Sequence, residues 1–216
     1  MASRSRTHAA PRPVVVGWLL VGFALGGFFD GILLHQILQW HHLLSGLDGA
    51  SSANLPFQIM MDGVFHLLMY VLGMFGMVLI LRGRADGATL GTSRILQLTL
   101  IGFAAWHILD AVLSHWLLGI HRIRQDSAQP LFWDLAWLVI FALGPLALSW
   151  LLNSRGQRGG DGGQTAATAL LVLTIVAGSV AGIGPTTAGQ KETIVVFRKN
   201  LSEQAMMDSV LASGAS

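Results

Sequence analysis

Two stretches of this chain carry an acid and two imidazoles at the same spacing within apolar sequence. They are "FFDGILLHQILQWHH" (residues 28–42) and "LDAVLSHWLLGIHRI" (residues 109–123). When residues 21–43 are aligned with residues 101–123, eight of the 23 positions are identical. An ionisable residue at bilayer depth costs at least ~2.5–3.5 kcal/mol, so matches at such positions are informative. Three of the eight are ionisable and predict an internal repeat: Asp30/Asp110, His35/His115 and His41/His121.

Asp and His side chains in this pattern suit a metal ion. Neutral imidazole binds copper, zinc or iron, and carboxylate shifts the preference towards iron, manganese or zinc. Two more apolar segments, "FQIMMDGVFH" and "PLFWDLAWL", each carry an Asp near their start. The first-choice ligands are His35, His66, His107, His115, Asp30, Asp62 and Asp110. The next candidates are His41, His121, Asp134 and Met69. Met69 is three residues from His66 in the sequence, and its thioether would suit Cu(I).

The composition places these residues in a membrane protein. The chain has 216 residues, of which 53% are hydrophobic and 11% charged, compared with about 25% charged residues in soluble domains. Long apolar runs predict membrane-spanning helices, so the lipid bilayer is an expected partner. The net charge of +2 is small and the basic residues are scattered, which argues against nucleic acid. The absence of Cys excludes disulfides, thiolate metal sites and iron–sulfur clusters.

The apolar runs predict an all-α membrane protein. We expect a four-helix bundle made of two tandem, pseudo-symmetric hairpins, followed by a fifth transmembrane helix and a short outer β-α tail. Because both hairpins run in the same direction, their pseudo-twofold axis is expected along the membrane normal. The predicted segments are an N-terminal segment (1–13), two hairpins (14–82 and 93–152), a Gly-rich linker (153–164), a fifth helix (165–183) and a strand–helix tail (189–216).

The placement of Lys and Arg predicts the orientation. Eight of these residues fall on the side of the N-terminus and five on the other side, which favours a cytoplasmic N-terminus and an outer C-terminus. The Asp and His residues then lie in the outer half of the helices. We expect the first helix to run from about Val14 to Leu44, and at about 100° per residue Asp30 and His41 share one of its faces.

Other interpretations of the polar residues remain open. Two His on facing helices could bind haem axially, as in an electron-transfer subunit. The same residues could form a structural hydrogen-bond network that fixes helix register, or a proton relay. No HExxH, GxSxG or phosphate-loop motif is present, and whether the protein is an enzyme is left open.

The motif "FFDGILLHQILQWHH", together with "MMDGVFHLLMYVLG", resembles a family of bacterial predicted membrane proteins that forms a domain of unknown function. The resemblance covers about residues 14 to 152. The chain is also similar to proteins that are encoded near, or joined to, membrane proteins of cytochrome oxidase copper assembly. The resemblance therefore implies the bacterial inner membrane, copper as the first choice of metal with zinc and iron as the other candidates, and a larger respiratory or assembly complex as partner. The tail from residue 189 resembles the start of a small ferredoxin-like module.

Overall fold

A computed structural model describes residues 12–47 and 54–156 of the chain. The chain divides into two compact units, Met1–Gly178 and Ser179–Ser216, and all described residues belong to the first. They form helices and connecting loops, with no strand in either described range. The predicted fifth helix (165–183) and strand–helix tail (189–216) lie outside the described residues.

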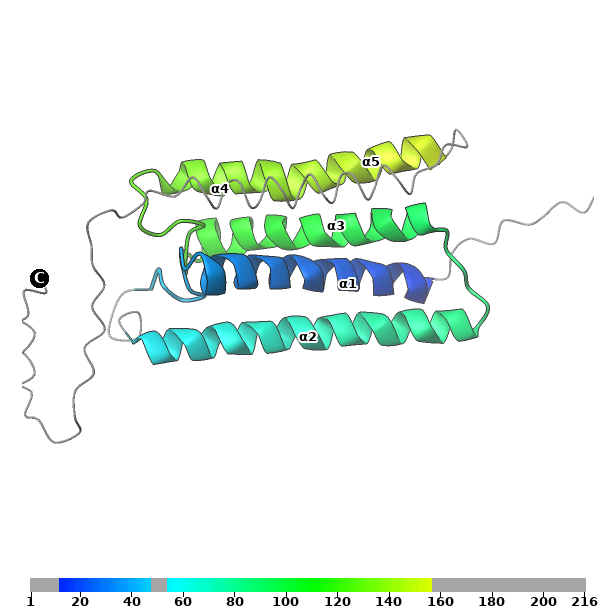
Figure 1. Ribbon diagram of the computed structural model, residues 1–216, viewed down its shortest axis with the longest axis horizontal. Helices are drawn as coiled ribbons and strands as arrows, with labels where there is room; N and C mark the ends of the chain where they lie inside the picture. Colours follow the sequence, from blue (N-terminus) through cyan, green and yellow to red (C-terminus); the bar gives the residue numbers. More distant parts are fainter. Residues whose placement is uncertain (1–11, 48–53, 157–216) are drawn as a thin grey trace, which may run out of the picture. The chain divides into compact units, whose positions relative to one another are not determined.

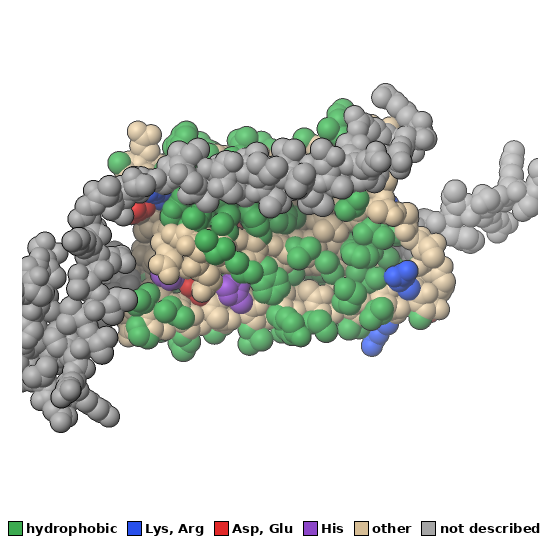
Figure 2. Space-filling view, in the orientation of Figure 1, with side chains coloured by type: hydrophobic (Ala, Val, Ile, Leu, Met, Phe, Trp, Pro, Cys, Tyr) green, Lys and Arg blue, Asp and Glu red, His purple; other side chains and the backbone are tan. Residues whose placement is uncertain are grey.

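Four stretches are long and apolar enough to cross a membrane. They are Arg12–Ile37, Leu55–Ala85, Thr92–Leu117 and Pro130–Ser154. Hydrophobic side chains are spread over the visible surface along the helices, and the Lys and Arg side chains in view lie towards the ends (Figure 2). The prediction of four helices long and apolar enough to span a membrane is confirmed for the described part of the chain.

Several of these stretches change from α-helix to π-helix. The elements in order are α1 (Arg12–Asp30), η1 (Gly31–Ile37), α2 (Leu55–Ala85), α3 (Thr92–Asp110), η2 (Ala111–Leu117), α4 (Pro130–Leu138), η3 (Val139–Leu143) and α5 (Gly144–Gly156). The start of α2 is capped by Asn54, whose side chain accepts a bond from the Phe57 amide at 3.2 Å. A proline lies in the first turn of both α2 and α4, where its missing N–H costs nothing.

α1 and α3, which carry parts of the two aligned stretches, lie side by side at the centre (Figure 1). α2 packs on α1, while α5 and η3 pack on α3. Gly22 and Gly102 allow the central pair to approach closely. A Cβ atom at Gly22 would lie 2.1 Å from the Thr99 carbonyl oxygen, and one at Gly102 would lie 2.1 Å from the Leu19 carbonyl oxygen. Small residues at such crossings let helix backbones touch within a bilayer.

The first helix ends earlier than the sequence analysis predicts. Helical structure stops at Ile37 rather than near Leu44, and the equivalent helix stops at Leu117. Gln39 and Gly119 then adopt positive φ values of 50° and 63°, so the chain turns sharply at aligned positions of the two stretches. His41 therefore lies in a loop, and the expectation that it shares a helix face with Asp30 is wrong.

Candidate metal centre

Six buried residues from the two aligned stretches gather at one end of the central helix pair. We call them the His/Asp cluster: Asp30, His35, His41, Asp110, His115 and His121. The His41 and His121 rings stack with centroids 4.5 Å apart and planes 5° apart. The His35 ring is 4.6 Å from His41, and the His115 ring is 4.9 Å from His121. Four imidazoles thus meet in one place, supplied by two helix ends and two loops.

The two loop histidines are held through their Nδ1 atoms. His41 Nδ1 donates to the Ile123 carbonyl at 3.0 Å, and His121 Nδ1 donates to the Leu43 carbonyl at 2.9 Å. A carbonyl oxygen can only accept, so each ring carries its hydrogen on Nδ1 and its lone pair on Nε2. Burial lowers the pKa of His41 well below its ordinary value, and the neighbouring His121 and His35 rings lower it further. His41 is therefore neutral, with Nε2 free to bind a cation.

The two helix histidines each face a carboxylate through Nδ1. His35 Nδ1 is 2.9 Å from Asp62 Oδ1, and His115 Nδ1 is 3.1 Å from Asp134 Oδ1. The N–H directions are not in line with these oxygens, so the contacts are close electrostatic pairs rather than well-aligned hydrogen bonds. A lone pair on Nδ1 would be repelled by the carboxylate, which favours a hydrogen on Nδ1 in both rings.

The Nε2 atoms point at one another or at a carboxylate. His35 Nε2 and His41 Nε2 are 3.0 Å apart. His115 Nε2 is 3.0 Å from Asp110 Oδ2, and His121 Nε2 is 3.5 Å from Asp110 Oδ1. Lone pairs at these separations repel unless a proton or a metal ion lies between them. Ligand atoms of Asp110, His115 and His121 lie within 4.8 Å of one another, close enough to hold one ion.

Asp62 and Asp134 have matching sets of partners. Asp62 accepts from His42 Nδ1 at 2.7 Å and from the Leu43 amide at 2.9 Å. Asp134 accepts from Arg122 Nη1 at 2.7 Å and from the Ile123 amide at 3.1 Å. His42 and Arg122 occupy equivalent positions in the alignment, as do Leu43 and Ile123. Both carboxylates are held in place by the loop that also carries a cluster histidine.

The π-helical turns explain the spacing of Asp and His. Residues five apart lie on different sides of an α-helix, which repeats every 3.6 residues. A π-helix bonds residue i to residue i+5 and so brings such residues together. The π-helices begin directly after Asp30 and Asp110. Asp110 and His115 consequently come within 3.0 Å of each other across one turn.

Three predicted ligands lie apart from the contacts of the cluster. His66 stacks on Phe28 with ring centroids 6.0 Å apart. His107 accepts a hydrogen bond from Trp137 Nε1 at 3.1 Å within an aromatic core. Met69 is buried against Gly27, where a Cβ atom would lie 2.3 Å from its sulfur. The other predicted residues lie in the cluster or contact it directly.

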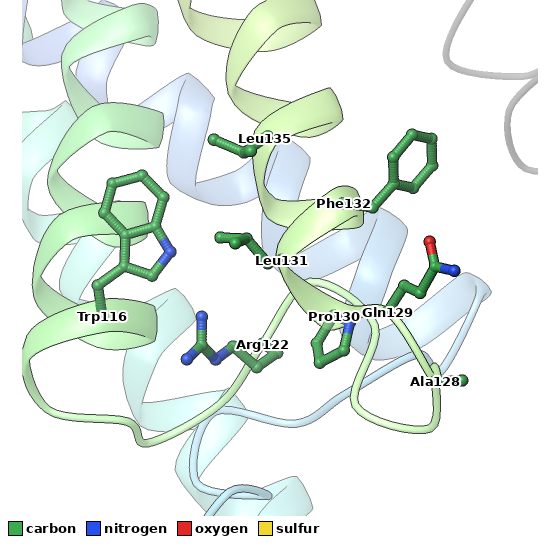
Figure 3. Close-up of a pocket in the computed structure, with 8 residues that line it drawn as sticks. All are labelled: Trp116, Arg122, Ala128, Gln129, Pro130, Leu131, Phe132 and Leu135. Atoms are coloured by element: carbon green, nitrogen blue, oxygen red, sulfur yellow. The ribbon is translucent and has the colours of Figure 1, made fainter.

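Two residues next to the cluster were missed by the sequence analysis. His42 and Arg122 directly follow the loop histidines and bind the carboxylates that face His35 and His115. The alignment pairs them at one position, and this basic pair was the available signal. Arg122 also borders an open groove of about 970 Å³, lined on one side by Trp116 and on the other by the first turns of α4 (Figure 3). Trp116 Nε1 donates to Asp134 at 3.2 Å, so the groove exposes two partners of this carboxylate.

Comparison with known proteins gives one match. A family model described as "Predicted membrane protein (DUF2243)" matches residues 17–156, the part of the chain that holds every residue of the His/Asp cluster. No curated protein and no solved structure matches the chain.

Proposed function

The chain belongs to this family of predicted membrane proteins, and we propose that it binds a transition-metal ion in its His/Asp cluster. One observation carries the proposal: the Nδ1 atoms of all four cluster histidines face acceptors, while their Nε2 atoms face one another or Asp110. Metal-binding histidines usually show this pattern, in which a carboxylate or carbonyl holds the second ring nitrogen. A bound ion would take the place of the hydrogen that His35 and His41 share.

Copper is our first choice of metal. Imidazole-rich sites bind Cu²⁺ more tightly than the other divalent ions of the first transition row. The cluster offers imidazole and carboxylate but no thioether, because Met69 lies elsewhere. The donor set thus favours Cu(II) over Cu(I), and it also accommodates zinc and iron. A copper-handling or oxidase-assembly role, within a larger respiratory complex, agrees with the family resemblance of the motif.

Haem is disfavoured by the same geometry. Two axial histidines must leave room for a flat macrocycle between their Nε2 atoms, with each Nε2 about 2.0 Å from the metal. The Nε2 atoms of His35 and His41 are only 3.0 Å apart, and the His41 and His121 rings stack directly on each other. A proton shared within the cluster, in a structural or relay network, is the alternative that the experiment below separates from a metal.

We place the cluster near the outer leaflet of a bacterial inner membrane. The loop between α2 and α3 lies at the opposite end of the helices and carries Arg82, Arg84 and Arg94 at its borders. Positive residues favour the cytoplasmic side, so the N-terminus would be cytoplasmic. The matching contacts of the two halves support their origin as two copies of one hairpin.

The test is metal analysis of the purified protein. We expect the wild-type protein, incubated with Cu(II), Zn(II) or Fe(II) and freed of excess ion, to retain stoichiometric metal without a Soret band. The double variant His41→Ala/His121→Ala should lose this metal. The variant His66→Ala is the matched control, because it removes an imidazole of the membrane region outside the cluster. A folded double variant that binds as much metal as the wild-type protein would contradict the proposal.

A further inference from the structure

The cluster has two halves with the same donors. One half consists of Asp110, His115 and His121, whose ligand atoms converge within 4.8 Å. The residues 80 positions earlier, Asp30, His35 and His41, form the other half. Each half contains one residue that ends an α-helix, one in a π-helix and one in the following loop. The question is whether the second half also holds an ion.

The histidines of the second half are arranged for one. His35 Nε2 and His41 Nε2 approach to 3.0 Å, while both Nδ1 atoms point outward to Asp62 and to the Ile123 carbonyl. Both rings are almost fully buried, at 2% and 3% exposure. Water therefore has little access to the two nitrogens, which are joined by one hydrogen bond. A cation bound by both nitrogens would take the place of the bridging hydrogen and form two ligand bonds.

Asp30 is the carboxylate at the matching position. Its side chain would turn to reach an ion, because among the described residues the ligand atoms that already converge are those of the other half. Its side chain is buried, and Oδ2 accepts a bond from Trp106 Nε1 at 3.2 Å. Oδ1 is buried as well and has no hydrogen-bond partner. His35 and Asp110 are close enough to act on its charge. A buried carboxylate oxygen without a donor is costly unless a cation offsets it.

The charge of the region also favours more than one cation. Four buried carboxylates surround the four imidazoles: Asp30, Asp62, Asp110 and Asp134. Arg122 pairs with Asp134, and the two side chains that pair with Asp62 are both histidines, His35 and His42. With neutral imidazoles, a single divalent ion would still leave negative charge uncompensated in a low-dielectric site.

We propose that Asp30, His35 and His41 form a second ion site, so that the cluster is a two-metal centre for divalent transition metals. Each ion takes two imidazole nitrogens and one carboxylate. This inference rests on the proposed metal-binding function, but it makes a separate claim about the number of ions. It also assigns a ligand role to Asp30 and His41, which the other half of the cluster does not need.

The number of ions per chain tests the inference. Purified protein is loaded with Cu(II), freed of excess ion and measured by native mass spectrometry and elemental analysis. We expect two ions in the wild-type protein and in the control His66→Ala, one in His41→Ala, one in His121→Ala and none in the double variant. The isosteric variant Asp30→Asn, which preserves the shape of the side chain, should also drop to one ion.

Electron paramagnetic resonance supplies a second readout on the same samples. Two neighbouring Cu(II) ions should give a coupled spectrum in the wild-type protein, and either single His variant should give the spectrum of an isolated ion. If the wild-type protein binds one ion and His41→Ala keeps it, the second site is wrong and the proposed function stands. If the wild-type protein binds none, both are wrong.

Discussion

His41 and His121 stack face to face, with ring centroids 4.5 Å apart, although 80 residues separate them in the chain. Each ring donates to the backbone of the loop that carries the other, through the carbonyls of Ile123 and Leu43. The two loops also bond directly, from the Gly46 amide to the Ile120 carbonyl at 2.7 Å. The position of each histidine therefore depends on the loop that carries the other.

Asp62 and Asp134, the carboxylates that face His35 and His115, should affect the metal affinity of the cluster. Replacing Asp62 or Asp134 by Asn keeps the side-chain shape and removes the charge that orients His35 or His115. We expect metal affinity to fall about 10–100-fold, the usual effect of losing such an orienting group. Asp126→Asn is the control, because that side chain is 71% exposed and pairs with Arg124. Competition titrations with a chelator measure the change; equal affinities in all three variants would rule out the orienting role.

Removing the metal should lower thermal stability. An ion present at 100 times its dissociation constant stabilises the folded state by about 2.7 kcal/mol. We therefore expect a strong chelator to lower the melting temperature of the wild-type protein in detergent. The double variant His41→Ala/His121→Ala should melt at the same temperature with and without chelator. A chelator effect of equal size in both proteins would point to an ion bound elsewhere.

The crossing of α1 and α3 should tolerate no added methyl group. Gly22→Ala and Gly102→Ala would each place a Cβ atom against a backbone carbonyl, which cannot move as a flexible side chain could. Overpacking of this kind costs about 1–3 kcal/mol. Gly63→Ala is the matched control, since a Cβ atom there meets nothing within 4 Å. Thermal melts of the three variants should separate the first two from the third, and uniform behaviour would contradict the close crossing.

Arg122 should be replaceable by His but not by Leu. His42 makes the equivalent contact with Asp62 at the same distance, 2.7 Å, as Arg122 makes with Asp134. Arg122→Leu leaves one oxygen of a fully buried carboxylate without its charged donor, at a cost of about 1–3 kcal/mol. We expect Arg122→His to retain most of that stability in a thermal melt. If both variants melt alike, the two positions are not equivalent.

The sequence was sufficient to find the membrane helices and most of the polar residues that meet. Apolar runs predict the four spans because each is long and lipid-compatible. The matched Asp and His residues indicate the cluster because ionisable residues are rare in membrane-spanning segments. What the sequence did not reveal is the π-helical turn after Asp30, because its residues differ little from those of an α-helix. A uniform 100° per residue then assigned His41 to the wrong face.

The order in which the sequence analysis ranked the histidines as ligands also assumed regular α-helix. His66 and His107 lie in regular helix and looked like central ligands, but His66 is half-buried against Phe28 and His107 is buried among aromatic rings. His41 and His121 follow the end of a helix and looked interfacial, yet the positive φ at Gln39 and Gly119 turns them inward. The residue type does not predict these turns, because a positive φ is typical of glycine and the first turn has Gln39 at this position.

The exchange of hydrogen bonds between the loops has a consequence for how the protein is made. The acceptor for His41 is synthesised 82 residues later, at Ile123. A ribosome that has completed only the first hairpin has thus delivered an acid and two imidazoles to the bilayer before the groups that complete their site exist. The site can therefore form only after both hairpins have been synthesised. A chain that ends after the first hairpin would place Asp30, His35 and His41 in the membrane without the residues that pair with them.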